Sequence, residues 1–140
     1  MSTDRVLLID DEIEFVGILA ERLRSRGLEV EVAHSGMDGV KKSQLTKFDA
    51  VVLDFAMPGM DGLATLKALM AGTPDLQVML LTGQATIKTA VEATRLGAVD
   101  ILEKPLDITT LMEKIREARA RHVSRAAERI RKQIPDPSRS

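Results

Sequence analysis

Polar side chains follow several short apolar runs in this chain, at the points where each run stops. These polar residues are Asp10, Asp11, Asp54, Thr82 and Lys104. Short continuous apolar runs are typical of strands in a parallel sheet that is covered by helices on both faces. If the runs are parallel strands, we expect all of these side chains to meet at the carboxyl edge of one sheet.

Such a meeting would place three carboxylates in one pocket, where they repel one another unless a divalent cation relieves the repulsion. Ligands that are all oxygen, without His or Cys, favour Mg²⁺ or Mn²⁺ over Zn²⁺. Thr82 and Lys104 would then donate hydrogen bonds to phosphate oxygens. The combination predicts phosphoryl transfer to a carboxylate nucleophile, Asp54, which gives an acyl phosphate.

Each of these residues has an ordinary explanation when it is taken alone. An Asp after a strand is usually a turn or cap residue. An Asp-Asp pair at a helix start usually reflects the preference for negative charge at that end of a helix. The occurrence of the whole set at one sheet edge, in this chain order, favours the chemical interpretation.

The elements that must position these residues alternate between strand and helix patterns. Strands are expected at residues 6–9, 28–33, 49–54, 76–81 and 99–102. Apolar residues at helical spacing predict helices that begin near residues 13, 36, 63, 87 and 108. Alternation with short connections implies right-handed crossovers and a parallel sheet between helix layers. In such sheets, ligands bind at the carboxyl ends of the strands.

The composition is that of an ordinary globular protein, with 140 residues of which 44% are hydrophobic and 29% charged. The absence of Cys excludes disulfides and thiolate metal sites. The first apolar run is too short for a signal peptide or a membrane span, so we expect a cytoplasmic protein with no membrane partner. Three Phe without Tyr or Trp argue against a base-stacking nucleic-acid surface.

Four motifs lie at the predicted sheet edge. They are Val6-Leu7-Leu8-Ile9-Asp10-Asp11, Leu53-Asp54 with Met57-Pro58-Gly59-Met60-Asp61-Gly62, Leu81-Thr82-Gly83, and Lys104-Pro105. Through these motifs the sequence resembles the receiver domain of two-component response regulators, a CheY-like superfamily, over roughly residues 4–120. The resemblance implies an α/β flavodoxin-like (βα)5 three-layer sandwich, whose five-stranded parallel sheet has the order 2-1-3-4-5.

The resemblance also implies roles for individual residues. Asp54 would accept a phosphoryl group from a sensor histidine kinase or a phosphotransfer protein, and Thr82 and Lys104 would hold the phosphoryl oxygens. The ligands implied for Mg²⁺ are Asp10, Asp11, Asp54 and the backbone carbonyl of Ala56. Such a domain catalyses only its own phosphotransfer and slow autodephosphorylation, so we do not expect an enzyme.

Phosphorylation is expected to switch a partner-binding face made of the fourth helix, the fifth strand and the fifth helix. The phosphoryl group adds negative charge and acceptor oxygens, toward which Thr82 would move. A downstream output protein or domain would read the change. Three residues before the lysine, many family members have Tyr or Phe, whereas this chain has Ile101. Either Ile101 simply packs in the core, or coupling to the output face is altered.

The last helix is expected to extend beyond the receiver domain. Its apolar residues recur at spacings of four, three and four: Val123, Ala127, Ile130 and Ile134. From Ile108 to Ile134 such a helix is about 40 Å long. Residues 116–140 carry eight basic and three acidic residues, although the net charge of the chain is −1. We therefore predict a receiver domain at residues 1–120, and a basic helical extension with a disordered tail at residues 121–140.

Several alternatives stay open at this point. The extension is a solvated linker, a homodimer contact through the fifth helix, or a nucleic-acid contact, which the lack of a DNA-reading motif disfavours. The domain is a stand-alone protein or the N-terminal part of a longer regulator.

Alternative functions for the chain as a whole make different demands on its residues. The main alternative is a non-phosphorylated receiver-like interaction or dimerisation module. An aspartyl phosphatase would need an acid two residues after the nucleophile, where this chain has Ala56. A flavodoxin-like cofactor binder would need a phosphate-binding loop and aromatic stacking residues.

Overall fold

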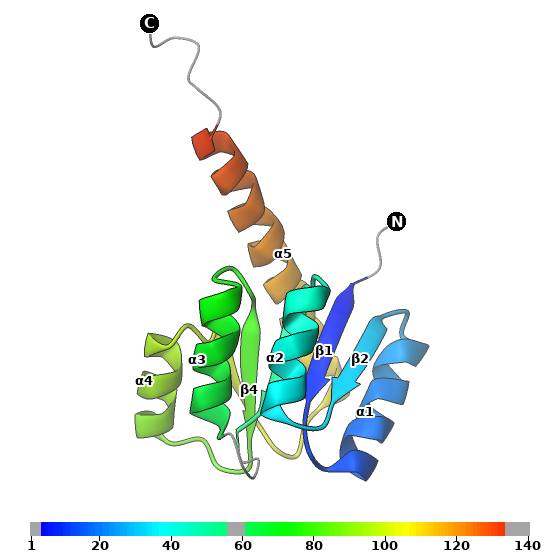
Figure 1. The fold of residues 1–140 in the computed structure, drawn as a ribbon. Coiled ribbons are helices and arrows are strands. Elements are labelled where there is room, and N and C mark those ends of the chain that lie inside the picture. Colours follow the sequence, from blue (N-terminus) through cyan, green and yellow to red (C-terminus); the bar gives the residue numbers. More distant parts are fainter. Residues whose placement is uncertain (1–3, 56–60, 134–140) are drawn as a thin grey trace, which may run out of the picture.

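The computed structural model describes residues 4–55 and 61–133, in which five strands alternate with five helices (Figure 1). The strands are β1 (Arg5–Ile9), β2 (Glu29–Ala33), β3 (Ala50–Asp54), β4 (Val78–Thr82) and β5 (Asp100–Glu103). The helices are α1 (Ile13–Ser25), α2 (Gly36–Leu45), α3 (Gly62–Gly72), α4 (Ile87–Arg95) and α5 (Ile108–Gln133). The predicted alternation is confirmed.

The five strands form one parallel sheet in the predicted order, β2-β1-β3-β4-β5. The register places Ile9 of β1 opposite Leu53 of β3. At the other end of the sheet it places Thr82 of β4 opposite Glu103 of β5. Because the strands are parallel and end at the same level, the residues that follow them share the carboxyl edge.

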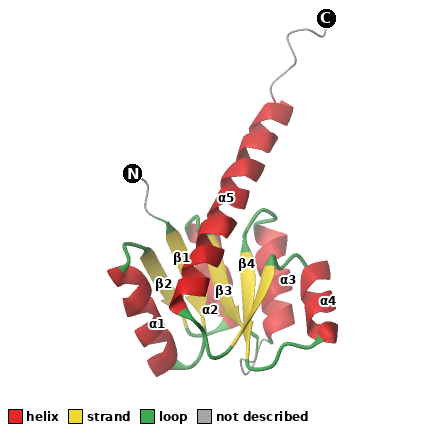
Figure 2. Ribbon diagram, turned by 180° about the vertical axis from the view of Figure 1, so that it is seen from behind, coloured by secondary structure: helices red, strands yellow, loops and turns green. Residues whose placement is uncertain are grey.

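Successive residues of the inner strands β1, β3 and β4 point to opposite faces of the sheet and enter two separate cores. Val6 and Leu8 of β1 pack with apolar residues of α1 and α5. Leu7 and Ile9 pack with apolar residues of α2, α3 and α4. Figures 1 and 2 show these two helix layers from opposite sides. Burial on both faces explains why these inner strands were recognisable as continuous apolar runs.

Local signals set the ends of the helices. The side chain of Ser35 accepts a 3.1 Å hydrogen bond from the backbone N–H of Asp38 at the start of α2. Gly27 and Gly97 follow α1 and α4 with φ angles of 91° and 108°, a region that favours glycine.

Helix α5 crosses the whole sheet and projects beyond the edge opposite to the carboxyl ends (Figure 1). Three contacts tie its middle to residues that lie just before β1, β4 and β3. They are Arg119–Asp4 (2.9 Å), Arg121–Gln77 (3.0 Å) and His122–Asp49 (3.7 Å). The predicted extension of the last helix is confirmed as far as Gln133, and Ile134 lies outside the described residues. No helix in the described ranges combines the length and the apolar character that crossing a membrane requires.

We predict that Arg121→Ala lowers the free energy of unfolding by about 1–3 kcal/mol, because it removes the partner of a buried amide oxygen. Arg121 Nε donates to Oε1 of Gln77, whose side chain is fully buried. Urea unfolding followed by circular dichroism measures the change. Arg125→Ala, on an exposed turn of α5, is the matched control and should change stability by less than about 0.5 kcal/mol. Equal stabilities of the two variants would contradict the prediction.

Candidate functional site

Three carboxylates meet at the carboxyl edge of the sheet. Asp10 follows β1 and Asp54 ends β3, and their side chains are 3% and 4% exposed. Glu12, at the N-cap position of α1, is exposed. One oxygen of each residue lies within 4.8 Å of the other two. This spacing suits a shared cation.

The backbone beyond β1 orients Asp10 within this group. The backbone N–H of Asp10 donates to the carbonyl of Ala33 at 3.0 Å, which continues the pairing of β1 with β2. The backbone N–H of Glu12 then donates to Oδ1 of Asp10 at 2.9 Å. These two bonds fix both the main chain and the side chain of Asp10, and they bring the first turn of α1 to the site.

Lys104, directly after β5, brings a positive charge to the acidic group. Its Nζ lies 3.2 Å from Oε1 of Glu12 and 4.8 Å from the centroid of the Phe15 ring. Burial lowers the pKa of Lys104, but the nearby Asp54, Glu12 and Asp10 together raise the pKa above its ordinary value. Lys104 therefore stays protonated at neutral pH. Its peptide bond to Pro105 is cis.

The surroundings of Asp10 raise its pKa to about 6. Burial is the largest cause, and repulsion by Asp54 and Glu12 adds to it, whereas the backbone N–H of Glu12 and the charge of Lys104 act in the opposite direction. The ionised form of Asp10 is therefore less stable than that of an ordinary carboxylate, and further positive charge at the site would stabilise it. A donor set of carboxylate oxygens fits Mg²⁺, or Mn²⁺, better than Zn²⁺.

Thr82 ends β4 at the same edge and is 6% exposed. Its hydroxyl exchanges hydrogen bonds of 3.3 Å with the backbone carbonyl and N–H of Gln84. The loop beyond Thr82 is also tied to β5, because the backbone N–H of Ala85 donates to Oε1 of Glu103 at 3.0 Å. In this structure the Thr82 hydroxyl is thus bonded within its own loop.

Phe55, directly after β3, is bonded to the first residue of α3. The N–H of Gly62 donates to the carbonyl of Phe55 at 3.1 Å. A Cβ at position 62 would lie 2.5 Å from that carbonyl oxygen, so the close approach requires glycine. Ala56, whose backbone carbonyl was a predicted metal ligand, lies outside the described residues.

The predicted site residues can now be compared with this geometry. Asp10, Asp54 and Lys104 are brought together, and Thr82 lies at the same edge. Among the described residues, the group of converging acidic oxygens does not include Asp11, which is half-buried beside Asp10. Glu12, which the structure places in the group, was not among the predicted site residues. An acid directly after an Asp-Asp pair at a helix start was the signal that could have pointed to it.

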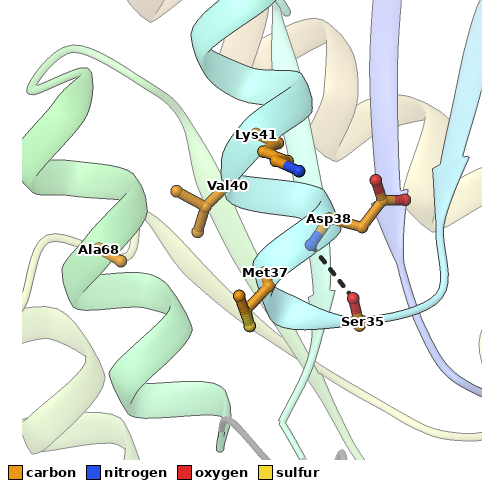
Figure 3. A pocket seen from close by; sticks show the side chains of 6 residues that line it. All are labelled: Ser35, Met37, Asp38, Val40, Lys41 and Ala68. Atoms are coloured by element: carbon orange, nitrogen blue, oxygen red, sulfur yellow. Dashed lines mark hydrogen bonds between the residues drawn. The ribbon is translucent and has the colours of Figure 1, made fainter.

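The charged group lies apart from a pocket of about 460 Å³ between α2 and α3 (Figure 3). That pocket is lined by Ser35, Met37, Asp38, Val40, Lys41 and Ala68. None of these residues is a predicted site residue. The candidate site is therefore identified by its charges and their spacing rather than by this hollow.

Comparison with known proteins gives consistent matches. A family model described as "Response regulator receiver domain" matches residues 6–116. The chain is 39% identical over 115 residues to the transcriptional regulatory protein ZraR of Salmonella typhimurium. The match covers 82% of this chain and 26% of that protein. The chain thus spans 26% of the length of this relative.

Solved structures show the same likeness. A CheY-like receiver domain protein from Methanospirillum hungatei has a TM-score of 0.83 and 27% identity, covering 89% of this chain and 99% of the other. A response regulator protein from Burkholderia pseudomallei was solved with a phosphorylated aspartic acid, a calcium ion and citrate. It has a TM-score of 0.76 and 30% identity, covering 94% of this chain and 75% of the other.

We predict that Asp10→Asn stabilises the metal-free protein at pH 7. Folding raises the pKa of Asp10 from its ordinary value of 3.8 to about 6. A raised folded pKa means that stability is lost as pH rises through this interval, by about 1–3 kcal/mol. The variant should lack this loss when unfolding is measured in EDTA across the same pH range.

Glu21→Gln is the control for this measurement, because it removes the same charge from an exposed position of α1. It should keep the pH dependence of the wild type. A variant Asp10→Asn that is less stable than the wild type at pH 7 would contradict the prediction.

Proposed function

Because this chain belongs to the response regulator receiver family, we propose that it accepts a phosphoryl group on Asp54 in a reaction that depends on Mg²⁺. The observation that carries the proposal is the buried Asp54 carboxylate, which shares an acidic group with Asp10 and Glu12. The charge of Asp54 also acts on Lys104. A receiver is a signalling domain of two-component regulators and does not act on a separate substrate.

The proposed chemistry is a transfer to a carboxylate. An oxygen of Asp54 forms a bond to phosphorus, and the bond from phosphorus to the donor's histidine nitrogen breaks. The bonding electron pair stays on that nitrogen. Lys104 and Thr82 donate to the phosphoryl oxygens and stabilise the charge that they carry.

The proposed metal ligands are Asp10, Asp11, Asp54 and the backbone carbonyl of Ala56. When bound, Mg²⁺ would neutralise negative charge on the carboxylates and on the phosphoryl oxygens. The support from this chain is the acidic group itself, in which burial and repulsion act against an ionised Asp10. The relative from Burkholderia pseudomallei was solved with a phosphorylated aspartic acid and a calcium ion, which is consistent with a divalent cation here.

The proposed phosphoryl donor is a sensor histidine kinase or a phosphotransfer protein, and the proposed recipient of the signal is an output protein or domain. The switching face would be α4, β5 and α5. In support, Ile87 and Val91 of α4 are 86% and 50% exposed, which leaves an apolar surface for a partner. Ile101 is partly buried and packs against the core that contains α4. An aliphatic side chain thus stands where many family members have an aromatic residue.

The test of phosphorylation is incubation with acetyl phosphate and Mg²⁺, followed by intact mass. We expect the wild type to gain about 80 Da, the mass of one phosphoryl group. The gain should disappear in EDTA and in Asp54→Asn, which keeps the side-chain volume. Asp38→Asn, at a half-buried position of α2 outside the acidic group, is the control and should gain the same mass. An equal gain in wild type and Asp54→Asn would place the acceptor elsewhere.

We also propose that a second copy of the chain binds along the extension of α5. Val123 and Ile130 are 57% and 58% exposed on this helix, where their spacing is typical of a coiled-coil seam. By the helical period, Arg125 and Lys132 lie on the opposite side. A pair of extensions could therefore bury its apolar residues and leave these charges in water.

We predict that Val123→Glu combined with Ile130→Glu gives a monomer, whereas the wild type is a dimer by light scattering. The matched control is Arg125→Glu with Lys132→Glu, which should stay dimeric. Substitution is preferable to truncation after residue 120, because truncation would also remove the bond from Arg121 to Gln77. A monomeric wild type at high concentration would rule out this contact.

A further inference from the structure

The carboxylate of Glu12 is paired with the ammonium group of Lys104. It also belongs to the acidic group in which a divalent cation would bind. In this structure its Oε1 accepts from Nζ of Lys104 at 3.2 Å. The same residue contributes one of the three oxygens that lie within 4.8 Å of one another, together with Asp10 and Asp54. A carboxylate that belongs to both groups can link the cation to the lysine.

Helix α1 holds the ammonium group of Lys104 through two side chains that are one turn apart. Glu12 forms the ion pair, and the ring of Phe15 lies 4.8 Å from Nζ. The side chain of Lys104 is 25% exposed, whereas that of Glu12 is 59% exposed. Glu12 therefore has more freedom to change its conformation than the lysine that it holds.

In the proposed reaction, Lys104 donates hydrogen bonds to the oxygens of the phosphoryl group on Asp54. The bond to Glu12 occupies one of the three N–H donors of Lys104 and draws the ammonium group toward α1. A divalent cation among the acidic oxygens carries twice the charge of the ammonium group and attracts the same carboxylate more strongly. Glu12 is close enough to respond through its side chain alone.

We propose that Glu12 is a positioning residue, which holds Lys104 before a cation binds and releases it when its carboxylate turns toward the cation. The inference rests on the proposed function and adds the order in which its steps occur. Lys104 becomes available for the phosphoryl group only after the divalent cation has bound. Glu12 itself does not contact the reacting atoms.

The test follows the side chain of Lys104 by NMR in the full chain with labelled lysine, during a titration with MgCl₂ alone. Lys104→Arg assigns the signal. In the wild type, Mg²⁺ should shift the Lys104 signal in a saturable way. In Glu12→Ala, the metal-free signal should already lie near the Mg²⁺-bound position of the wild type, and Mg²⁺ should move it much less.

Two further variants make the result specific. Glu12→Gln keeps a hydrogen-bond acceptor without the charge, and its Lys104 signal should lie between those of the wild type and Glu12→Ala. Glu14→Gln removes an exposed charge from the first turn of α1 and should behave as the wild type. Glu12→Ala should also weaken Mg²⁺ binding by about tenfold, as expected when a residue that supports a metal site is lost.

The acetyl phosphate experiment separates this inference from the proposed function. One outcome would overturn the role of Glu12 alone. In it, the wild type gains the phosphoryl mass, but the Lys104 signals of wild type and Glu12→Ala coincide both before and after Mg²⁺ is added. Wild type that gains no mass would count against phosphorylation itself, and with it against the order proposed here.

Discussion

Repulsion among carboxylates at the carboxyl edge of the sheet is the constraint on which the rest of this site depends. Parallel pairing of β1 with β3 places Asp10 next to Asp54, because Ile9 and Leu53 are paired in the register. Both carboxylates are buried, and burial with mutual repulsion raises the pKa of Asp10 to about 6. One ammonium group, that of Lys104, offsets this charge only in part. The fold thus holds a negative site that favours the arrival of further positive charge.

The strands and helices could be predicted because the signals that specify them are local. Val6 and Leu8 enter one core and Leu7 and Ile9 the other, so β1 had to be a continuous apolar run. Ser35 caps α2 through a bond to a residue three positions away. The order of the strands is a different matter. The apolar runs indicated a parallel sheet, but the order of its strands came from the family resemblance.

The limits of prediction at the site have the same physical origin. Asp10, Asp54 and Lys104 were predictable because strand ends of a parallel sheet share one edge. The bond of Glu12 to Lys104 was not predictable, because it joins residues that are 92 positions apart. The bond from Arg121 to Gln77 spans 44 positions, and no periodic pattern records it either. Contacts between side chains of distant elements depend on rotamers and helix orientation, which a single sequence does not specify.

Contacts between distant elements also connect the site with β5 and α5, so a structural change at the site could move both elements. Under the proposed switch, Thr82 gives up its bonds to Gln84, and the loop beyond it must move. That loop is tied to β5 through Ala85 and Glu103, the residue before Lys104. An aromatic ring at position 101 is therefore not needed to connect the loop with β5. Because α5 starts just beyond Lys104 and is held at the far edge of the sheet, movement of β5 would tilt the helix as a unit. The projecting end of α5 would then move furthest, although it lies far from the phosphorylated carboxylate.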